Sequence, residues 1–265
     1  MHQHPIRFEA CSPAKGLVFS VEQMRRVDAF AIDELGLPGL ILMEHASIAL
    51  RVACGELAPP DAPACVLVGP GNNGGDGLAL ARLLHTASPR RDITCVLLAP
   101  GRTSSDGATN LRVLEAMLDG SDGHLRIEDE LPDQLPEGSL VVDAMFGSGL
   151  DRPLAGRFEE AVRWTEAQHA RGCFVLAADV PSGLDADTGE PVQSHAGRDS
   201  PTVRANRTVT LGGVKRGFLQ DGSRVWAGEV CVGDIGVPRW VLERFGEPIG
   251  SEIRAEGGSR STGRE

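Results

Sequence analysis

The sequence predicts an α/β protein, organised as a three-layer α/β/α sandwich around a mostly parallel sheet, with a helical extension at its N-terminus. Short runs that are apolar throughout alternate with amphipathic stretches of helical length. Strands that are apolar on both faces are typical of parallel sheets covered by helices on each side. No internal repeat or heptad pattern competes with this interpretation.

The helical extension is predicted from capping and spacing. Ser20 and Gln23 have the spacing of a capping box, in which each side chain accepts a hydrogen bond from the other's backbone N–H. The apolar residues that follow at helical spacing are Met24, Val27, Phe30 and Ala31. Gly36 and Pro38 are expected to end this helix, and a second helix is expected over about 40–57.

The alternation proper starts after this extension. The predicted strands are 64–68, 93–98, 140–146, 174–178, 208–211 and 229–232. Helices are predicted between the first four of them, at about 76–86, 108–118 and 158–171. In a doubly wound sheet of order 2-1-3-4, the strands at 64–68 and 140–146 are neighbours at the switch point, where ligands bind.

Charge and composition exclude several classes of protein. The chain of 265 residues has 26 Lys and Arg against 37 Asp and Glu, which gives a net charge of −11. Nucleic acids and anionic membranes bind to dense cationic surfaces, so neither is an expected partner. The N-terminus lacks the apolar core of a signal peptide, and no apolar run approaches the length of a membrane helix.

The cysteines indicate the redox compartment, and the composition of the termini indicates the domain bounds. The six cysteines are scattered without a C-x-x-C pair, so small buried side chains in a reduced, cytoplasmic compartment are expected. One domain is predicted over 20–245, after an N-terminal tail at 1–19. The Gly- and Ser-rich residues of the segment 246–265 predict a disordered tail.

A glycine-rich turn follows the first buried strand. Gly69, Gly71 and Gly74 match G-x-G-x-x-G between a strand and a helix, where backbone N–H groups favour an anion. The usual acid at the end of the second strand is missing, and so is the G-K-[ST] of a P-loop. A tight turn with Asn72 and Asn73 in left-handed conformations therefore remains an alternative.

Two further loops carry glycines and oxygen-bearing side chains. The strand that contains Asp143 runs into the loop 147–153, and the next strand runs into a loop with Asp179 and Ser182. Together with Asn73, these side chains would meet at the carboxyl edge of the sheet and could serve as ligands of a hard cation of low charge or as proton carriers. Lys215 could contact a phosphate or be a solvated hairpin residue.

Three motifs identify a resemblance: PGNNGGDGL at 70–78, DAMFGSGL at 143–150 and DVPSGLD at 179–185. With them the chain resembles the NAD(P)H-hydrate epimerase family, or YjeF N-terminal domain, over about residues 20–240. The resemblance implies a Rossmann-like sandwich that interconverts the R and S forms of hydrated NADH and NADPH at C6 of the nicotinamide ring. Where the family usually reads LMENAG, this chain has His45 and Ser47.

The resemblance also implies the site. A potassium ion, one per subunit, would be held by Asn73, Asp143 and Ser182. The implied substrate contacts are Asn72, Asn73, Gly74, Gly75, Asp76, Gly147, Ser148, Gly149, Leu150, Asp151, Arg152, Pro153 and Asp179. Asp179 is the candidate catalytic residue, because inversion at C6 needs a carboxylate that can act as acid and base.

The implied partners are the substrate NADHX or NADPHX and a separate dehydratase specific for the S form, since 265 residues leave no room for a dehydratase domain. A homodimer is possible. Two other functions stay open. One is a non-catalytic module of the same fold that binds a nucleotide or a protein. The other is an NADP-dependent oxidoreductase, in which Arg102 would hold the 2′-phosphate.

Overall fold

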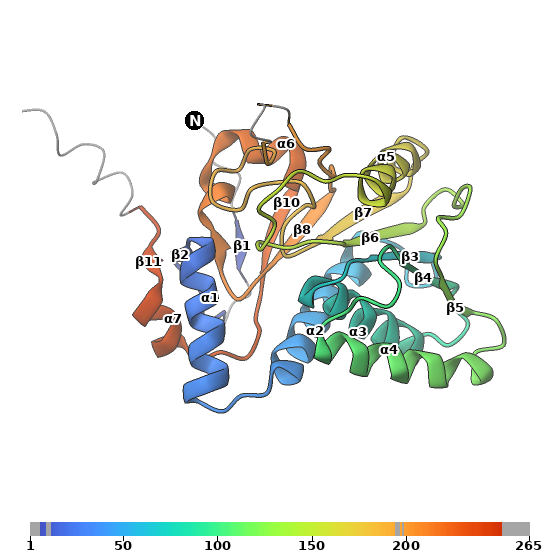
Figure 1. Ribbon diagram of the computed structural model, residues 1–265, viewed down its shortest axis with the longest axis horizontal. Coiled ribbons are helices and arrows are strands. Elements are labelled where there is room, and N and C mark those ends of the chain that lie inside the picture. The colour runs from blue at the N-terminus through green and yellow to red at the C-terminus, as the bar shows by residue number, and fades with distance from the viewer. Residues whose placement is uncertain (1–5, 9–11, 194–196, 198, 251–265) are drawn as a thin grey trace, which may run out of the picture.

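The main sheet has the parallel architecture that the sequence predicts (Figure 1). A computed structural model describes residues 6–8, 12–193, 197 and 199–250. Within these residues the sheet has eight strands in the order β1-β10-β8-β7-β6-β3-β4-β5, and each neighbouring pair is parallel. The predicted order around the switch point, β4-β3-β6-β7, is confirmed.

The strands of this sheet are β1 (Arg7–Phe8), β3 (Ala64–Val68), β4 (Ile93–Leu97), β5 (Leu125–Glu128), β6 (Leu140–Ala144), β7 (Phe174–Ala178), β8 (Arg207–Leu211) and β10 (Glu229–Gly233). The helices are α1 (Val21–Ala29), α2 (Gly39–Leu57), α3 (Asn72–Ala87), α4 (Ser105–Met117), α5 (Arg157–Ala170), α6 (Arg224–Ala227) and α7 (Arg239–Phe245). A small second sheet joins β11 (Glu247–Pro248), β2 (Leu17–Phe19) and β9 (Val214–Lys215) in that order.

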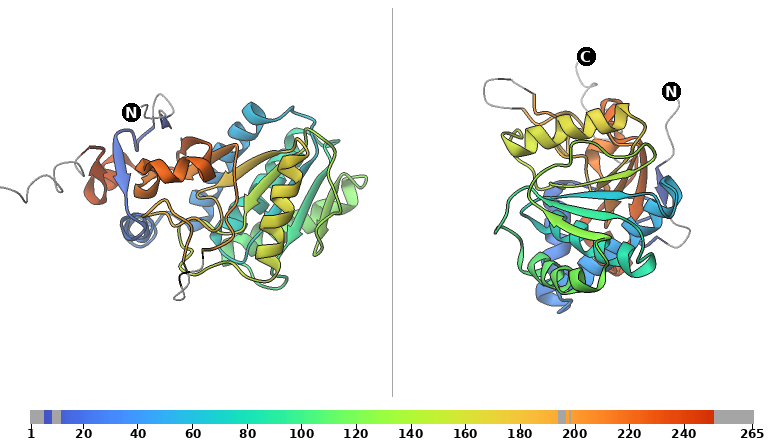
Figure 2. Two further views of the ribbon diagram at one scale, coloured as in Figure 1. Left: turned by 90° about the horizontal axis from the view of Figure 1, so that it is seen from above. Right: turned by 90° about the vertical axis from the view of Figure 1, so that its right-hand side faces the viewer.

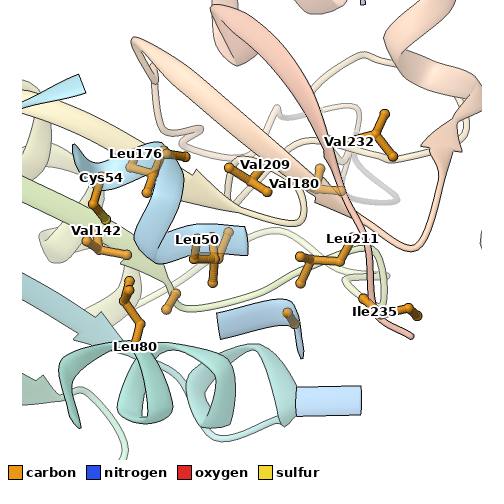
Figure 3. Close-up of a cluster of buried hydrophobic side chains, with 14 of the residues drawn as sticks. Leu50, Cys54, Leu80, Val142, Leu176, Val180, Val209, Leu211, Val232 and Ile235 are labelled. Atoms are coloured by element: carbon orange, nitrogen blue, oxygen red, sulfur yellow. The ribbon is translucent and has the colours of Figure 1, made fainter. Parts of the chain in front are cut away.

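Helices cover both faces of the main sheet, so the three-layer prediction is confirmed. The helices α2, α3 and α4 pack together on one face, and α5 lies on the other (Figure 1, Figure 2). Alternate residues of one strand enter different cores: Val66 belongs to the core under α2 and α3, and Cys65 belongs to the core under α5. Figure 3 shows the first of these cores, where Leu50 and Leu80 lie close to the sheet.

The glycine-rich turn is shorter than the sequence predicts, because α3 begins at Asn72 and not near Asp76. Gly74 therefore lies in the first turn of the helix. A Cβ on Gly74 would lie 2.0 Å from the carbonyl oxygen of Gly69, and one on Gly77 would lie 2.5 Å from the Cβ of Ala144. These glycines let the helix start approach the sheet closely, and the alternative with left-handed asparagines is wrong.

The N-terminal segment enters the fold before residue 20. The capping box of Ser20 and Gln23 is confirmed, and α1 continues into a π-helical turn at Phe30–Glu34. The strand β2, inside the segment expected to be a tail, is fully buried and pairs with β9 and with β11. Of the C-terminal tail predicted at 246–265, Glu247–Pro248 form β11, and residues 251–265 lie outside the described residues.

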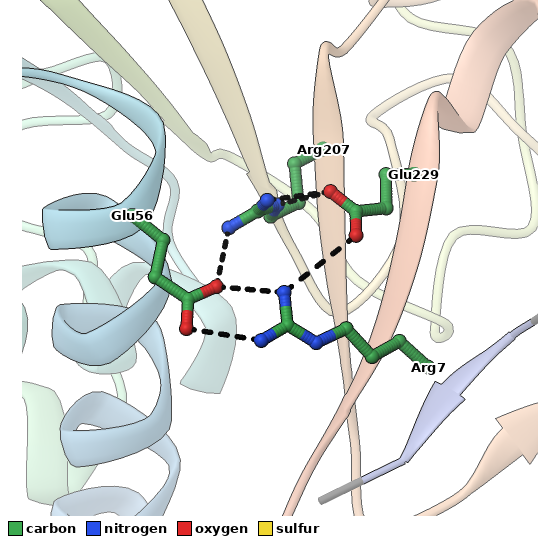
Figure 4. A network of polar contacts seen from close by, with 4 residues as sticks. All are labelled: Arg7, Glu56, Arg207 and Glu229. Atoms are coloured by element: carbon green, nitrogen blue, oxygen red, sulfur yellow. Dashed lines mark hydrogen bonds and ion pairs between the residues drawn. The ribbon is translucent and has the colours of Figure 1, made fainter.

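A network of four charged side chains ties elements together near the amino ends of β8 and β10 (Figure 4). Nη1 of Arg7 and Nη1 of Arg207 each lie 2.9 Å from Oε2 of Glu56 on α2. Nη2 of Arg207 lies 2.5 Å from Oε2 of Glu229. The network joins the edge strand β1, the helix α2 and two inner strands at the end of the sheet opposite to the glycine-rich loops.

No helix in the described part of the chain is long and apolar enough to cross a membrane. The cysteines described are all free; four of them are buried and Cys231 is partly buried. Cys11 lies outside the described residues. The prediction of small, unpaired cysteines is thus confirmed for the five that the structure describes.

Candidate active site

A cavity of about 440 Å³ opens at the carboxyl edge of the sheet. It is lined by the loops after β3, β6 and β7, as the sequence predicts, and also by α1, the start of α2 and β9. The predicted substrate-binding residues that line it are Asn72, Asn73, Asp76, Gly147, Ser148, Gly149, Leu150 and Asp179. The cavity thus joins the three motif-bearing loops with segments that the motifs do not include.

The other predicted substrate-binding residues do not line this cavity: Gly74, Gly75, Asp151, Arg152 and Pro153. Gly75 lies inside the packing of α3, where a Cβ would meet the side chain of Met43 at 2.4 Å. The next three follow Leu150 in the loop after β6, and Asp151 and Arg152 are exposed. Arg102 is also exposed and lies outside the lining.

Asp143 and Ser182 meet directly beneath the loops. The backbone N–H of Ser182 donates to Oδ2 of Asp143 at 2.7 Å, and its hydroxyl donates to Oδ1 at 2.6 Å. The same hydroxyl accepts a hydrogen bond from the N–H of Phe146 at 3.0 Å. Burial raises the pKa of Asp143 to about 6, although hydrogen bonds from Ser182 and from the N–H of Met145 act in the opposite direction.

Asn73 has no partner for its side-chain amide among the described residues. Both Oδ1 and Nδ2 are buried without a hydrogen bond. Oδ1 lies close to the loop after β6, because a Cβ on Gly147 would be 3.3 Å from it. A buried amide oxygen without a donor loses its hydration and gains nothing in return. The Asn73 side chain therefore has the properties expected of a ligand-binding group.

Asp179 carries a buried ion pair with Lys215. Nζ of Lys215 lies 2.5 Å from Oδ1 of Asp179 and donates also to the carbonyl oxygen of Leu211 at 2.5 Å. The N–H of Ser148 donates to Oδ2 of Asp179 at 2.8 Å. Burial alone would raise the pKa of Asp179, but the charge and hydrogen bond of Lys215 outweigh it and leave the pKa below its ordinary value.

The backbone at Asp179 is unusual as well. Its φ is +64°, one of two such values at non-glycine residues in the described part of the chain. Left-handed backbone at a residue other than glycine costs of the order of 1 kcal/mol and occurs often at functional sites. The Lys215 side chain is 2% exposed and lines the cavity. Its interpretation as a solvated hairpin residue is therefore wrong, while a phosphate contact stays a prediction.

Three further carboxyl groups line the cavity: Asp28 on α1, Asp76 on α3 and Asp106 on α4. Burial raises the pKa of Asp28 to about 6, with the charge of Lys215 opposing the shift and that of Asp179 adding to it. Burial, then the charges of Asp179 and Asp28, raise the pKa of Asp76 well above its ordinary value. The cavity therefore holds one carboxylate kept ionised and two carboxyl groups that resist ionisation.

Asp28 is the functional candidate that the sequence interpretation missed. The spacing of Met24, Asp28 and Ala31 at i, i+4 and i+7 puts a carboxyl group on the apolar face of α1. A charged residue at a core-facing helical position is the signal that could have identified it.

Ser47, which differs from the usual family pattern LMENAG, connects the two helices α2 and α3 beside the site. Its Oγ lies 2.7 Å from the carbonyl oxygen of Met43 and 3.0 Å from that of Asp76, so it bridges α2 and α3. His45 packs beside Gly236, where a Cβ would be 3.3 Å from the imidazole ring. Neither side chain lines the cavity.

Comparison with known proteins decides the family. The model of the "YjeF-related protein N-terminus" family matches residues 39–217, which include all three motif-bearing loops and Lys215. The chain belongs to the YjeF N-terminal family. The resemblance found in the motifs is therefore confirmed over more than half of the chain.

Relatives with curated names match four fifths or more of this chain. A protein of Limosilactobacillus fermentum named NAD(P)H-hydrate epimerase is 36% identical over 80% of this chain and 93% of its own length. One of Rhodopirellula baltica with the same name is 35% identical over 84% of this chain and 86% of its own length. The bifunctional NAD(P)H-hydrate repair enzyme of Thermofilum pendens is 35% identical over 85% of this chain but only 41% of its own length.

Among solved structures, the crystal structure of the yeast protein YNL200c superposes with a TM-score of 0.67 at 24% identity. The match covers 89% of this chain and 96% of the yeast chain. It confirms the Rossmann-like α/β/α fold of this family member.

Proposed function

We propose that this family member is an NAD(P)H-hydrate epimerase, an isomerase that interconverts the R and S forms of hydrated NADH and NADPH. The observation that supports this most strongly is the buried Asp179–Lys215 pair in the wall of the cavity between the motif-bearing loops. The names of relatives at 33–36% identity over most of the chain support the same activity.

Epimerisation at C6 is a proton-transfer problem. The hydroxyl on C6 leaves as water when it is protonated, because the lone pair of the adjacent ring nitrogen forms a C=N double bond as the C–O bond breaks. Water then adds to the opposite face, and a base accepts the proton that the water loses. Asp179 is the catalytic residue that we propose for this exchange, because Lys215 keeps its carboxylate ionised in a buried position.

The remaining loops are proposed to hold the dinucleotide. The start of α3 and residues 147–150 line the cavity, and helix starts favour phosphate groups. Of the predicted contacts, we assign Asn72, Asn73, Asp76 and 147–150 to the cavity itself. Asp151, Arg152 and Pro153 continue the same loop and are proposed to contact the part of the dinucleotide outside the cavity.

A potassium ion fits the residues that the sequence predicts for it. The amide oxygen of Asn73 has no donor, and Ser182 Oγ retains a free lone pair after accepting from Phe146 and donating to Asp143. An amide, a carboxylate and a hydroxyl oxygen are ligands that a hard cation of low charge prefers. When bound there, the ion would supply positive charge beneath the loops and fix the Asn73 side chain.

The partners follow from the reaction. A dehydratase specific for the S form would consume one epimer, so that epimerisation makes the R form repairable. The bifunctional relatives support this pairing of activities. A second copy of the chain is the partner proposed for an exposed apolar stripe on α2, formed by Ile41, Ile48 and Val52 at 44%, 41% and 49% exposure. Free, buried cysteines support a reducing compartment such as the cytoplasm.

The other two functions receive less support. Arg102 lies outside the cavity lining, so the proposed holder of a 2′-phosphate in an oxidoreductase is not at the site. A purely binding module would have no need for a desolvated Asp–Lys pair, which is costly to bury.

The proposed activity is tested with a mixture of R and S NADHX and an excess of an S-specific dehydratase. The purified protein should accelerate consumption of the R form beyond its spontaneous rate. Asp179→Asn should slow this acceleration by about 100- to 10,000-fold, the usual contribution of a general acid–base group. Asp133→Asn, an exposed carboxyl outside the cavity, is the matched control and should act as the unmodified protein does. Absence of any acceleration by the unmodified protein would exclude the epimerase function.

A further inference from the structure

The carboxyl group of Asp28 is a polar feature of the cavity that the family motifs leave without a role. It enters the cavity from α1, which precedes the segment matched by the family model. Within the described residues its side chain has no hydrogen bond or ion pair, and Asp28 is partly buried. A partly buried carboxyl group that lines a cavity and has no protein partner is free to interact with a bound ligand.

The charges that surround Asp28 come from several elements. Lys215 of β9 and Asp179 after β7 act on it directly through their charges. Asp76 of α3, Asp106 of α4 and Arg25 of α1 also line the cavity. Since Lys215 is already bound to Asp179, it does not neutralise Asp28. Asp28 is thus a carboxyl group on a separate element that lines the same cavity as the Asp179–Lys215 pair.

Inversion at C6 needs proton transfer on both faces of a flat ring. One face loses a protonated hydroxyl as water, and the other face receives water that must lose a proton. A single carboxylate in a fixed position reaches one face only, unless the ring turns over in the cavity. Two carboxyl groups on different elements that face one cavity remove this requirement.

We propose that Asp28 is a second catalytic residue of the epimerase, which exchanges a proton with the C6 oxygen on the face of the ring that Asp179 does not serve. This rests on the epimerase function proposed above. In one direction the Asp28 carboxyl gives its proton to the departing hydroxyl, the C–O electron pair goes to oxygen, and water leaves. Water adds on the other face, the C=N electron pair returns to nitrogen, and Asp179 accepts the proton. The reverse direction exchanges the two roles, and solvent resets the protons.

The ionisation of the two groups agrees with this division of roles. The pKa of Asp28 is raised to about 6, so it keeps its proton at higher pH than an ordinary carboxyl does. The pKa of Asp179 is lowered, so it stays ionised. Environments that push the pKa values of two carboxyl groups apart are a recurring arrangement in acid–base catalysis.

The test compares Asp28→Asn with Asp33→Asn, an exposed carboxyl five residues further along that does not line the cavity. With Asp28→Asn, kcat for R-form consumption should fall about 100- to 10,000-fold while KM changes less than about threefold. The unmodified protein should lose activity as the pH rises above the pKa of Asp28. Asp28→Asn should lack this dependence, and Asp28→Glu should retain it with partial activity. Asp33→Asn should leave both constants unchanged.

Three results would overturn the inference without touching the proposed function. They are an Asp28→Asn protein with unchanged kcat, one in which only KM rises, and one whose pH profile matches that of the unmodified protein. If Asp28→Asn fails to fold, as circular dichroism would show, Asp28→Glu decides through its own pH profile. Failure of the unmodified protein to accelerate R-form consumption would instead remove the epimerase function itself.

Discussion

Lys215, which the second sheet positions, holds Asp179 in its ionised form: the ammonium lies 2.5 Å from Oδ1 of the carboxylate, and the lysine side chain is 2% exposed. The backbone N–H groups of Ser148 and Leu211 also donate to Asp179, and Nζ of Lys215 donates to the carbonyl oxygen of Leu211. The pair is therefore enclosed by the loop after β6 and the end of β8. The lysine approaches from a strand that lies outside the three motifs at 70–78, 143–150 and 179–185.

Removing the lysine charge should destabilise the protein strongly. Lys215→Met leaves a buried carboxylate unpaired, which costs about 3–5 kcal/mol in comparable pairs. The free energy of unfolding, measured by urea denaturation at neutral pH, should fall by this amount. Lys15→Met, at the exposed second lysine of the chain, is the matched control and should change it by less than about 0.5 kcal/mol. Adding Asp179→Asn to Lys215→Met should recover part of the loss; no recovery would argue against the pair as its cause.

Acid should weaken the protein through Asp179. Its pKa is lowered on folding, so its contribution to stability is present above the ordinary carboxyl pKa of about 4 and is lost as the pH falls through the lowered value. The unmodified protein and Asp179→Asn differ in their free energy of unfolding. This difference should therefore shrink as the pH falls from about 5 to about 2. Asp133→Asn should show no such trend, and a difference that is constant with pH would contradict the assignment.

Potassium should stabilise the fold through Asn73. A ligand at about 100 times its Kd adds about 2.7 kcal/mol, which corresponds to several degrees in Tm for a chain of this size. The measurement is Tm in potassium chloride against equal concentrations of choline chloride, which controls for ionic strength. The potassium-dependent increase should disappear in Asn73→Ala. An equal increase in both proteins would place the ion elsewhere.

A methyl group at Gly74 should separate α3 from the sheet. The added Cβ would lie 2.0 Å from the carbonyl oxygen of Gly69, a backbone atom that cannot move aside cheaply. Gly74→Ala is expected to lower the unfolding free energy by about 3 kcal/mol or more. Gly55→Ala is the matched control in another helix, where nothing lies within 4 Å, and should raise it by about 0.5–1 kcal/mol. Equal effects at both glycines would contradict the packing role.

The sequence predicts the inner strands of the main sheet well because they are short runs that are apolar on both faces. Such runs are typical of a parallel sheet covered by helices on each side. The sequence locates Asp143, Ser182 and Asp179 because each follows or ends such a run. Lys215 was not placed at the cavity for the opposite reason: it lies in β9, which pairs with β2, and strands of two or three residues have no recognisable periodicity. Asp28 lies on a helix that the sequence does predict, but the spacing alone does not show which part of the fold that helix faces. The start of α3 was misplaced because glycine disfavours helices in general and is required here by close packing.

The strand β2 links the amino-terminal segment to the Asp179–Lys215 pair in the cavity. Its last residue, Phe19, is in register with Lys215 in β9, and α1 with Asp28 begins two residues later. A chain that started at residue 20 would keep every side chain of the cavity and lose the strand beside Lys215. A change in the length of the segment between β2 and α1 would therefore alter the active site, although no residue of β2 lines the cavity.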